Sequence, residues 1–147
     1  MGRLNLPSSG QIYVDAQVAI YSTGNHPLYA SICAPVWQVS GDAIVVSSEL
    51  TLLEILVTPF RNGDILLASQ REGLWKQTNT RLIPITQELL REAARLRAII
   101  PGLKTPDAIH AATALVHGSA MFLTNDIGIR RVPGLPLVLL DDVLAAP

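Results

Sequence analysis

Ile12-Tyr13-Val14-Asp15 is a short apolar run that closes on a carboxylate, and Phe122-Leu123-Thr124-Asn125-Asp126 is a second run of this kind late in the chain. Such runs predict strands, and they alternate with helix-like segments. The predicted strands lie near residues 11–14, 43–46, 81–84, 120–123 and 136–139, and the predicted helices near 16–22, 27–39, 49–58, 62–73, 86–99 and 105–117. This alternation predicts an α/β fold with a mainly parallel sheet of about five strands.

The composition predicts one soluble domain over residues 1–147. A chain of 147 residues with 49% hydrophobic and 16% charged residues is too apolar to be disordered, and it suits a sheet covered on both faces. We expect loose tails at residues 1–10 and after Leu144. A single cysteine, Cys33, cannot form an internal disulfide, and no apolar stretch has the length of a signal peptide or a membrane span. We therefore expect a cytoplasmic protein that does not associate with membranes.

Four acids lie inside or directly against apolar runs: Asp15, Glu54, Asp107 and Asp126. A buried carboxylate is costly unless a cation meets it. Two carboxylates about 4 Å apart repel by roughly 4 kcal/mol at an effective dielectric constant near 20, so a cluster of them needs metal ions or protons. If the four acids meet, a divalent-metal site is the chemistry that they predict.

The predicted topology allows them to meet. Open parallel sheets bind ligands beyond the carboxyl ends of their strands, where the strand order reverses. Asp15 follows the first strand, Asp126 follows the fourth, and Asp107 is in the first turn of the helix that leads to the fourth strand. Glu54 would approach the same place from the helix after the second strand.

Each acid also has a structural explanation, which stays open at this point. Asp15 could be a helix N-cap, Asp107 could complement a helix dipole, and Asp126 could be a turn former. Glu54 is harder to explain in this way, because its helix has almost no polar stripe. We interpret Glu49 as a first-turn charge of the same helix.

The remaining polar residues carry weaker signals. No second His or Cys stands at ligand spacing from His110, which argues against zinc. We therefore interpret His110 and His117 as packing or surface residues, and His26 as a loop residue. The net charge of −1 argues mildly against a nucleic-acid partner, although a bound Mg²⁺ would reverse the local sign.

The order of four motifs resembles the PIN-domain family of the VapC toxin type, over residues 11–140. The motifs are Ile12-Tyr13-Val14-Asp15, Ser48-Glu49-Leu50-Thr51-Leu52-Leu53-Glu54-Ile55-Leu56, Thr105-Pro106-Asp107-Ala108-Ile109-His110-Ala111-Ala112-Thr113-Ala114 and Leu123-Thr124-Asn125-Asp126. The resemblance implies a three-layer α/β/α domain that binds Mg²⁺ or Mn²⁺ and cleaves single-stranded RNA or RNA loops. It places the catalytic quartet on Asp15, Glu54, Asp107 and Asp126, and two supporting positions on Thr124 and Lys104.

For the mechanism, our hypothesis has Asp15 and Asp126 as direct metal ligands, Asp107 as a ligand directly or through water, and Glu54 orienting or deprotonating the attacking water. The resemblance also implies a homodimer and an antitoxin whose tail lies in a groove. Residues 50–57 and 65–74, with Phe60 and Trp75, could line that groove or could be ordinary core.

Two other functions remain. One is a non-catalytic interaction module with the PIN fold, which would be marked by a missing acid, and none of the four is missing. The other is a phosphoryl-accepting α/β domain with Asp15 as the nucleophile. That function is less favoured, because such phosphatases have a second acid two positions later, where this chain has Gln17.

Overall fold

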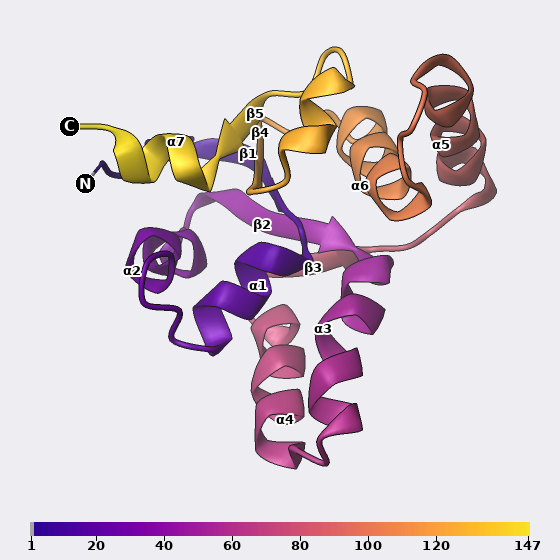
Figure 1. The fold of residues 1–147 in the computed structure, drawn as a ribbon. Helices are drawn as coiled ribbons and strands as arrows, with labels where there is room; N and C mark the ends of the chain where they lie inside the picture. The colour runs from indigo at the N-terminus through magenta and orange to yellow at the C-terminus, as the bar shows by residue number, and fades with distance from the viewer. Residues whose placement is uncertain (1) are drawn as a thin grey trace.

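A computed structural model describes residues 2–147 and contains one five-stranded sheet (Figure 1). The strands are β1 (Ser9–Val14), β2 (Asp42–Ser48), β3 (Thr80–Ile83), β4 (Met121–Thr124) and β5 (Leu137–Leu139), in the order β3-β2-β1-β4-β5. Every neighbouring pair is parallel. The predicted α/β fold with a parallel sheet is therefore confirmed, and the strand order reverses between β1 and β4.

The helices surround this sheet. They are α1 (Ala16–Thr23), α2 (Ala30–Cys33), α3 (Glu49–Arg61), α4 (Ile65–Gly73), α5 (Gln87–Ile99), α6 (Thr105–Val116) and α7 (Leu140–Ala145), with 3₁₀ turns η1 (Ala34–Gln38), η2 (Leu74–Lys76) and η3 (Ile127–Arg131). Thr86 caps α5 as predicted, with its hydroxyl accepting from Leu89 N at 3.2 Å, and Pro106 lies in the first turn of α6.

Side chains along a strand point alternately to the two faces of the sheet, so the hydrophobic core has two parts, one on each face. Ile12 and Val14 of β1 pack with residues of α1, α2, α3 and α4, whereas Tyr13 packs on the opposite face with residues of α5, α6 and η3. All three side chains are fully buried. Helices thus cover both faces of the sheet, which gives the three layers of an α/β/α fold.

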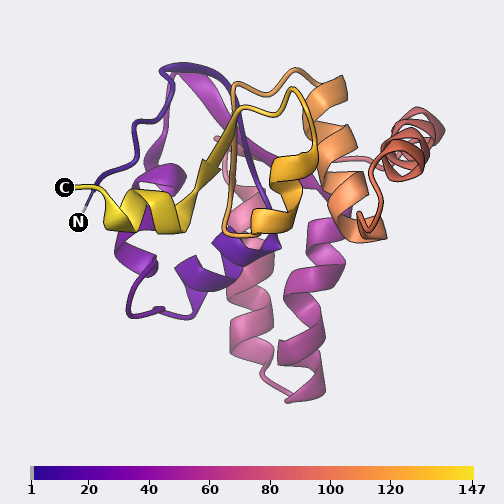
Figure 2. The same ribbon diagram turned by 45° about the horizontal axis from the view of Figure 1, so that its top comes forward.

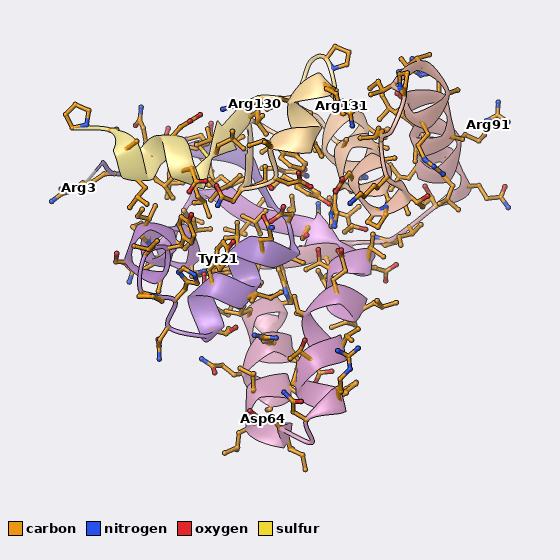
Figure 3. The ribbon with its side chains drawn as sticks, viewed as in Figure 1. Arg3, Tyr21, Asp64, Arg91, Arg130 and Arg131 are labelled. Carbon is orange, nitrogen blue, oxygen red and sulfur yellow. The ribbon has the colours of Figure 1, made fainter. Side chains whose placement is uncertain are left out.

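Helices α3 and α4 form a pair that projects away from the sheet (Figures 1 and 2). Asp64 lies at the far end of this pair, between the two helices (Figure 3). Pro59 lies inside α3 and has no N–H, so it cannot donate to the carbonyl of Ile55 four residues earlier. Arg71 of α4 uses that carbonyl instead, because its Nη1 donates to Ile55 O at 3.0 Å.

The helix predicted over residues 27–39 is wrong in detail. Pro27 lies in a turn rather than in a first helical turn, and two short helices follow it, α2 and then η1. Pro35 at the start of η1 has no N–H to continue the hydrogen bonds of α2, which accounts for the break. The short helix α7 was not predicted. Its N-cap residue, Leu139, has no side chain that can cap it, and Asn125 accepts instead from Asp141 N in the first turn at 3.0 Å.

The prediction of a loose N-terminal tail over residues 1–10 is also wrong for the residues that the structure describes; Met1 lies outside them. Strand β1 begins at Ser9, Leu4 and Leu6 pack against the core, and Gly2 N donates to Val143 O at 3.1 Å. At the other end, α7 continues through Leu144 to Ala145. Between residues 2 and 147, no helix has both the length and the apolarity that a membrane crossing requires.

Candidate active site at the carboxyl ends of β1 and β4

Asp15 stands directly after β1, where the strand order reverses. Its Oδ1 caps α1 by accepting from Gln17 N at 3.1 Å and from Val18 N at 3.4 Å. Its Oδ2 accepts from the hydroxyl of Thr124, a fully buried residue at the end of β4. The capping explanation is therefore correct for one oxygen, while the other oxygen joins Asp15 to the neighbouring strand.

Thr124 also connects Asp15 to Asp126. The Thr124 hydroxyl oxygen accepts from Asp126 N at 3.0 Å, and the Asp126 carboxylate accepts from Gly128 N at 2.9 Å. Asp126 thus has the turn-forming role that was left open, and the same turn keeps its half-buried carboxylate beside the ends of β1 and β4.

Asp107 lies half-buried in the first turn of α6. Its pKa is raised, first by burial and then by the adjacent carboxylate of Asp126, whereas the charge of Lys104 acts in the opposite direction. An acid whose pKa is raised by another acid has that acid as a close neighbour. Asp107 and Asp126 therefore share one region of the site.

Glu54 reaches the site from α3, where His110 of α6 holds it. The distance from His110 Nε2 to Glu54 Oε1 is 2.6 Å, and the distance from His110 Nδ1 to the hydroxyl oxygen of Tyr13 is also 2.6 Å. The Glu54 side chain is 29% exposed, and His110 is only 4% exposed. The interpretation of His110 as a mere packing or surface residue is therefore incomplete.

The sequence contained only a weak signal for this role, the position of His110 one turn after Asp107. His117 is exposed at the end of α6, and His26 lies in a loop, as predicted.

The charge of Glu54 affects the pKa of Asp15. The pKa of the Asp15 carboxyl is raised to about 6, mainly by burial and to a smaller extent by the charge of Glu54. The hydrogen bond from Thr124 is the largest effect that lowers this pKa. The four predicted acids thus form two interacting pairs, Asp15 with Glu54 and Asp107 with Asp126, which Thr124 and His110 link at one edge of the sheet.

These side chains suit a hard cation in their chemistry, but they do not form a closed cage. Carboxylate and hydroxyl oxygens are the donors that Mg²⁺ selects, and a cation would relieve the raised pKa values of Asp15 and Asp107. Within the part of the chain that the structure describes, no three His, Cys, Asp or Glu side chains are placed to hold a metal ion. Because Mg²⁺ is usually held by one or two carboxylates together with water and substrate phosphate, a pair of acids meets its needs.

Three cations lie at the loop that precedes α6, the helix whose first turn carries Asp107, and we call them the basic rim: Arg97, Lys104 and Arg131. Arg97 Nε donates to Leu103 O at 2.9 Å, and Arg131 Nη1 donates to Pro101 O, so both arginines hold the loop before α6. Lys104 is exposed at the N-cap position of α6, close enough to Asp107 to lower its pKa. Among residues 2–147, no salt bridge joins a carboxylate to any member of the rim. The sequence indicated only Lys104.

The expected groove walls divide into core and surface. Trp75 and Ile55 are buried in the core, so they do not line an open groove. Six other side chains of α3 and α4 are exposed and form what we call the hairpin patch: Leu52, Leu53, Val57, Phe60, Ile65 and Leu66. Phe60 is 66% exposed and lines two neighbouring hollows of about 370 and 380 Å³.

Comparison with known proteins places this geometry in context. A family model described as PIN domain matches residues 12–135. No curated protein sequence matches the chain. The fold is similar to that of VapBC2 from Rickettsia felis bound to a promoter DNA fragment, with a TM-score of 0.71 and 15% identity over 88% of this chain and 98% of that one. It is also similar to a toxin–antitoxin complex from Klebsiella pneumoniae, with a TM-score of 0.65 and 20% identity over 88% and 97% of the two chains. VapC20 from Mycobacterium tuberculosis, described as a Sarcin-Ricin loop cleaving toxin, has a TM-score of 0.64 and 17% identity over 76% and 86%.

Proposed function

The chain belongs to the PIN domain family, and from this premise we propose that it is a metal-dependent endoribonuclease, the toxin of a type II toxin–antitoxin pair. The observation that carries the proposal is the Asp15–Thr124–Asp126 linkage at the point where the strand order reverses. The description of VapC20 as a Sarcin-Ricin loop cleaving toxin supports the choice of RNA as substrate. Action on cellular RNA would place the protein in the cytoplasm.

Asp15 and Asp126 would hold Mg²⁺ or Mn²⁺, with Asp107 binding directly or through water. When bound, the ion neutralises charge that develops on the phosphate and lowers the pKa of water. Glu54 then accepts a proton from the attacking water, while its other carboxylate oxygen is held by His110. Thr124 keeps the Asp15 carboxylate turned toward β4, beside the turn that carries Asp126.

The basic rim gives the RNA backbone a place to bind despite the net charge of −1. Because no carboxylate within residues 2–147 is ion-paired with Arg97, Lys104 or Arg131, their charges are available to phosphates that flank the cleavage position. This arrangement favours a negatively charged polymer over a small neutral substrate.

We also propose that the hairpin patch binds a cognate antitoxin. Monomeric soluble proteins rarely expose a continuous apolar surface of this kind, and Ile65 and Leu66 are 80% and 85% exposed. The structures from Klebsiella pneumoniae and Rickettsia felis are described as a toxin–antitoxin complex and as VapBC2, respectively. A homodimer remains a prediction, which the molar mass in solution would test.

The use of Asp15 as a phosphoryl acceptor is disfavoured, because both of its oxygens accept hydrogen bonds, from the start of α1 and from Thr124. A non-catalytic module remains the main alternative.

Incubation of the purified protein with a mixed RNA pool separates these functions. The arms contain Mg²⁺, Mn²⁺ or a chelator, and each is run with the wild type and with Asp15→Asn. We expect wild-type cleavage in both metals, none with chelator and none by the variant. Intact RNA in every arm would support the non-catalytic module.

A further inference from the structure

Three side chains from three separate elements form a continuous hydrogen-bonded line that ends on Glu54. The amide N–H of Ser48 donates to the hydroxyl oxygen of Tyr13 at 3.1 Å, that oxygen lies 2.6 Å from His110 Nδ1, and His110 Nε2 lies 2.6 Å from Glu54 Oε1. Tyr13 comes from β1, His110 from α6 and Glu54 from α3. The line therefore connects the central strand to helices on both faces of the sheet.

The direction of the line follows from its first member. A backbone N–H can only donate, so the Tyr13 oxygen accepts from Ser48 and offers its own hydrogen elsewhere. A buried phenol keeps its proton at neutral pH. The Ser47 hydroxyl also faces the Tyr13 oxygen, but His110 Nδ1 lies only 2.6 Å from that oxygen, and we assign the phenol hydrogen to this short contact. Nδ1 is then an acceptor, and in neutral imidazole this assigns the single ring hydrogen to Nε2, which faces Glu54.

Packing holds the line in place. The Tyr13 ring stacks on Phe122 with centroids 4.8 Å apart, and it meets the His110 ring edge-on at 5.8 Å. Tyr13 and Phe122 are fully buried. Neither the phenol nor the imidazole can turn away without opening the core.

We infer that His110 is a positioning residue in the neutral Nε2–H form, selected by Tyr13, and that it fixes the Glu54 carboxylate through Oε1 so that Oε2 faces the reacting water. In this form His110 adds no positive charge to the site, and the carboxylate of Glu54 accepts from it. The part that Glu54 plays in cleavage rests on the proposed function; the ring tautomer does not.

The tautomer is tested by ¹⁵N NMR of the wild-type protein labelled at histidine, near pH 7. The chain has three histidines, and the signals of His110 are assigned by their loss in His110→Gln. We expect the Nε2–H pattern in the wild type and a mixture of tautomers in Tyr13→Phe, which keeps the ring and removes the hydroxyl. An imidazolium or an Nδ1–H ring in the wild type would overturn the inference.

Kinetics test the positioning role. We expect His110→Ala to lower kcat by about 10²-fold with little change in KM for RNA, because a carboxylate displaced by about 1 Å loses roughly that factor. His110→Gln, whose amide can donate from near the Nε2 position, should recover most of the loss, whereas His110→Asn should not. His117→Gln on the exposed end of the same helix is the matched control and should behave like the wild type.

The outcomes separate the two proposals. Equal loss in the Gln, Asn and Ala variants, or an unchanged kcat in all three, would refute positioning of Glu54 by His110. If the wild type cleaves no RNA in any metal, the proposed function fails, while the NMR result still decides whether Tyr13 selects the tautomer.

Discussion

Thr124, the last residue of β4, donates its hydroxyl hydrogen to the carboxylate of Asp15, the first residue after β1. The same oxygen accepts from the N–H of Asp126. One hydroxyl group therefore sets the relative position of two predicted metal ligands that are far apart in the sequence.

Thr124→Val tests this hydroxyl group with almost no change in shape. The variant leaves the Asp126 N–H and one Asp15 oxygen without a partner in a buried place, so we expect a loss of about 1–3 kcal/mol in the free energy of unfolding. Cleavage should also require more Mg²⁺. Chemical denaturation and a metal titration measure the two effects. Thr113→Val is the control: Thr113 is equally buried, but its hydroxyl donates only within α6, to Ile109 O, so the cost should be smaller.

The pKa of about 6 for Asp15 predicts a pH dependence of stability in metal-free protein. A carboxyl normally titrates near 4, so between about pH 4 and pH 6 the folded state binds more protons than the unfolded state. The contribution of Asp15 is therefore present at low pH and is lost as the pH rises through 6. The full shift corresponds to about 3 kcal/mol, and partial solvent screening should reduce it to the order of 1 kcal/mol.

Denaturation with a chelator across this pH range measures that slope, and Asp15→Asn should flatten it. With Mg²⁺ present the trend should reverse, because the cation competes with the proton and binds more tightly as Asp15 ionises. A metal-free stability that rises between pH 4 and 6 would contradict the raised pKa.

Arg71 is 6% exposed, and its polar contacts are with Thr23 and with the carbonyl of Ile55, at 3.0 Å each. We expect Arg71→Met to lower the free energy of unfolding by about 1–3 kcal/mol, because the carbonyl that Pro59 cannot satisfy loses its donor. Activity per folded molecule should stay near the wild-type value. Arg61→Met, at an exposed position of α3, should leave stability within about 0.5 kcal/mol. Thermal unfolding of the two variants compares them directly.

A charged substitution in the hairpin patch should abolish antitoxin binding without affecting stability or RNA cleavage. Phe60→Asp changes an exposed side chain, so stability should move by no more than about 0.5 kcal/mol and RNA cleavage should persist. Binding of the proposed antitoxin should be lost, as measured by calorimetry or co-purification. Ile99→Asp, on an exposed position of α5, is the control and should bind normally. Normal binding by Phe60→Asp would place the antitoxin elsewhere.

The basic rim predicts a salt effect. Lys104→Ala should weaken RNA binding and reduce the slope of log affinity against log salt by about 0.7, the value for one phosphate contact on a single strand. Fluorescence anisotropy with chelator present measures binding without cleavage. Lys76→Ala, an exposed lysine in the turn that precedes the amino end of β3, is the control. Arg91 projects from the outer side of α5 (Figure 3) and offers a second distant cation for comparison.

Much of the architecture was predictable because it depends on local patterns. The apolar run at Ile12, the cap at Thr86 and the proline in the first turn of α6 each indicate an element within a few residues. The reversal of strand order then brings Asp15 and Asp126 together, as the general behaviour of parallel sheets predicts.

The rest was not predictable because it depends on partners that are distant in the sequence. His110 acquires its role from Tyr13, 97 positions away, and from Glu54, 56 positions away. Arg131 belongs to the basic rim only because it bonds to the loop at Pro101. Leu4 and Leu6 look like part of a tail until the fold supplies the core that buries them.

The proline in α3 and the arginine in α4 form a single unit, since the first leaves a carbonyl free and the second uses it. Anyone who transplants the projecting helix pair onto a related scaffold must therefore carry both residues. A graft with Arg71 but without Pro59 would bring two donors to the carbonyl of Ile55. A graft with Pro59 but without Arg71 would leave this carbonyl buried without a donor.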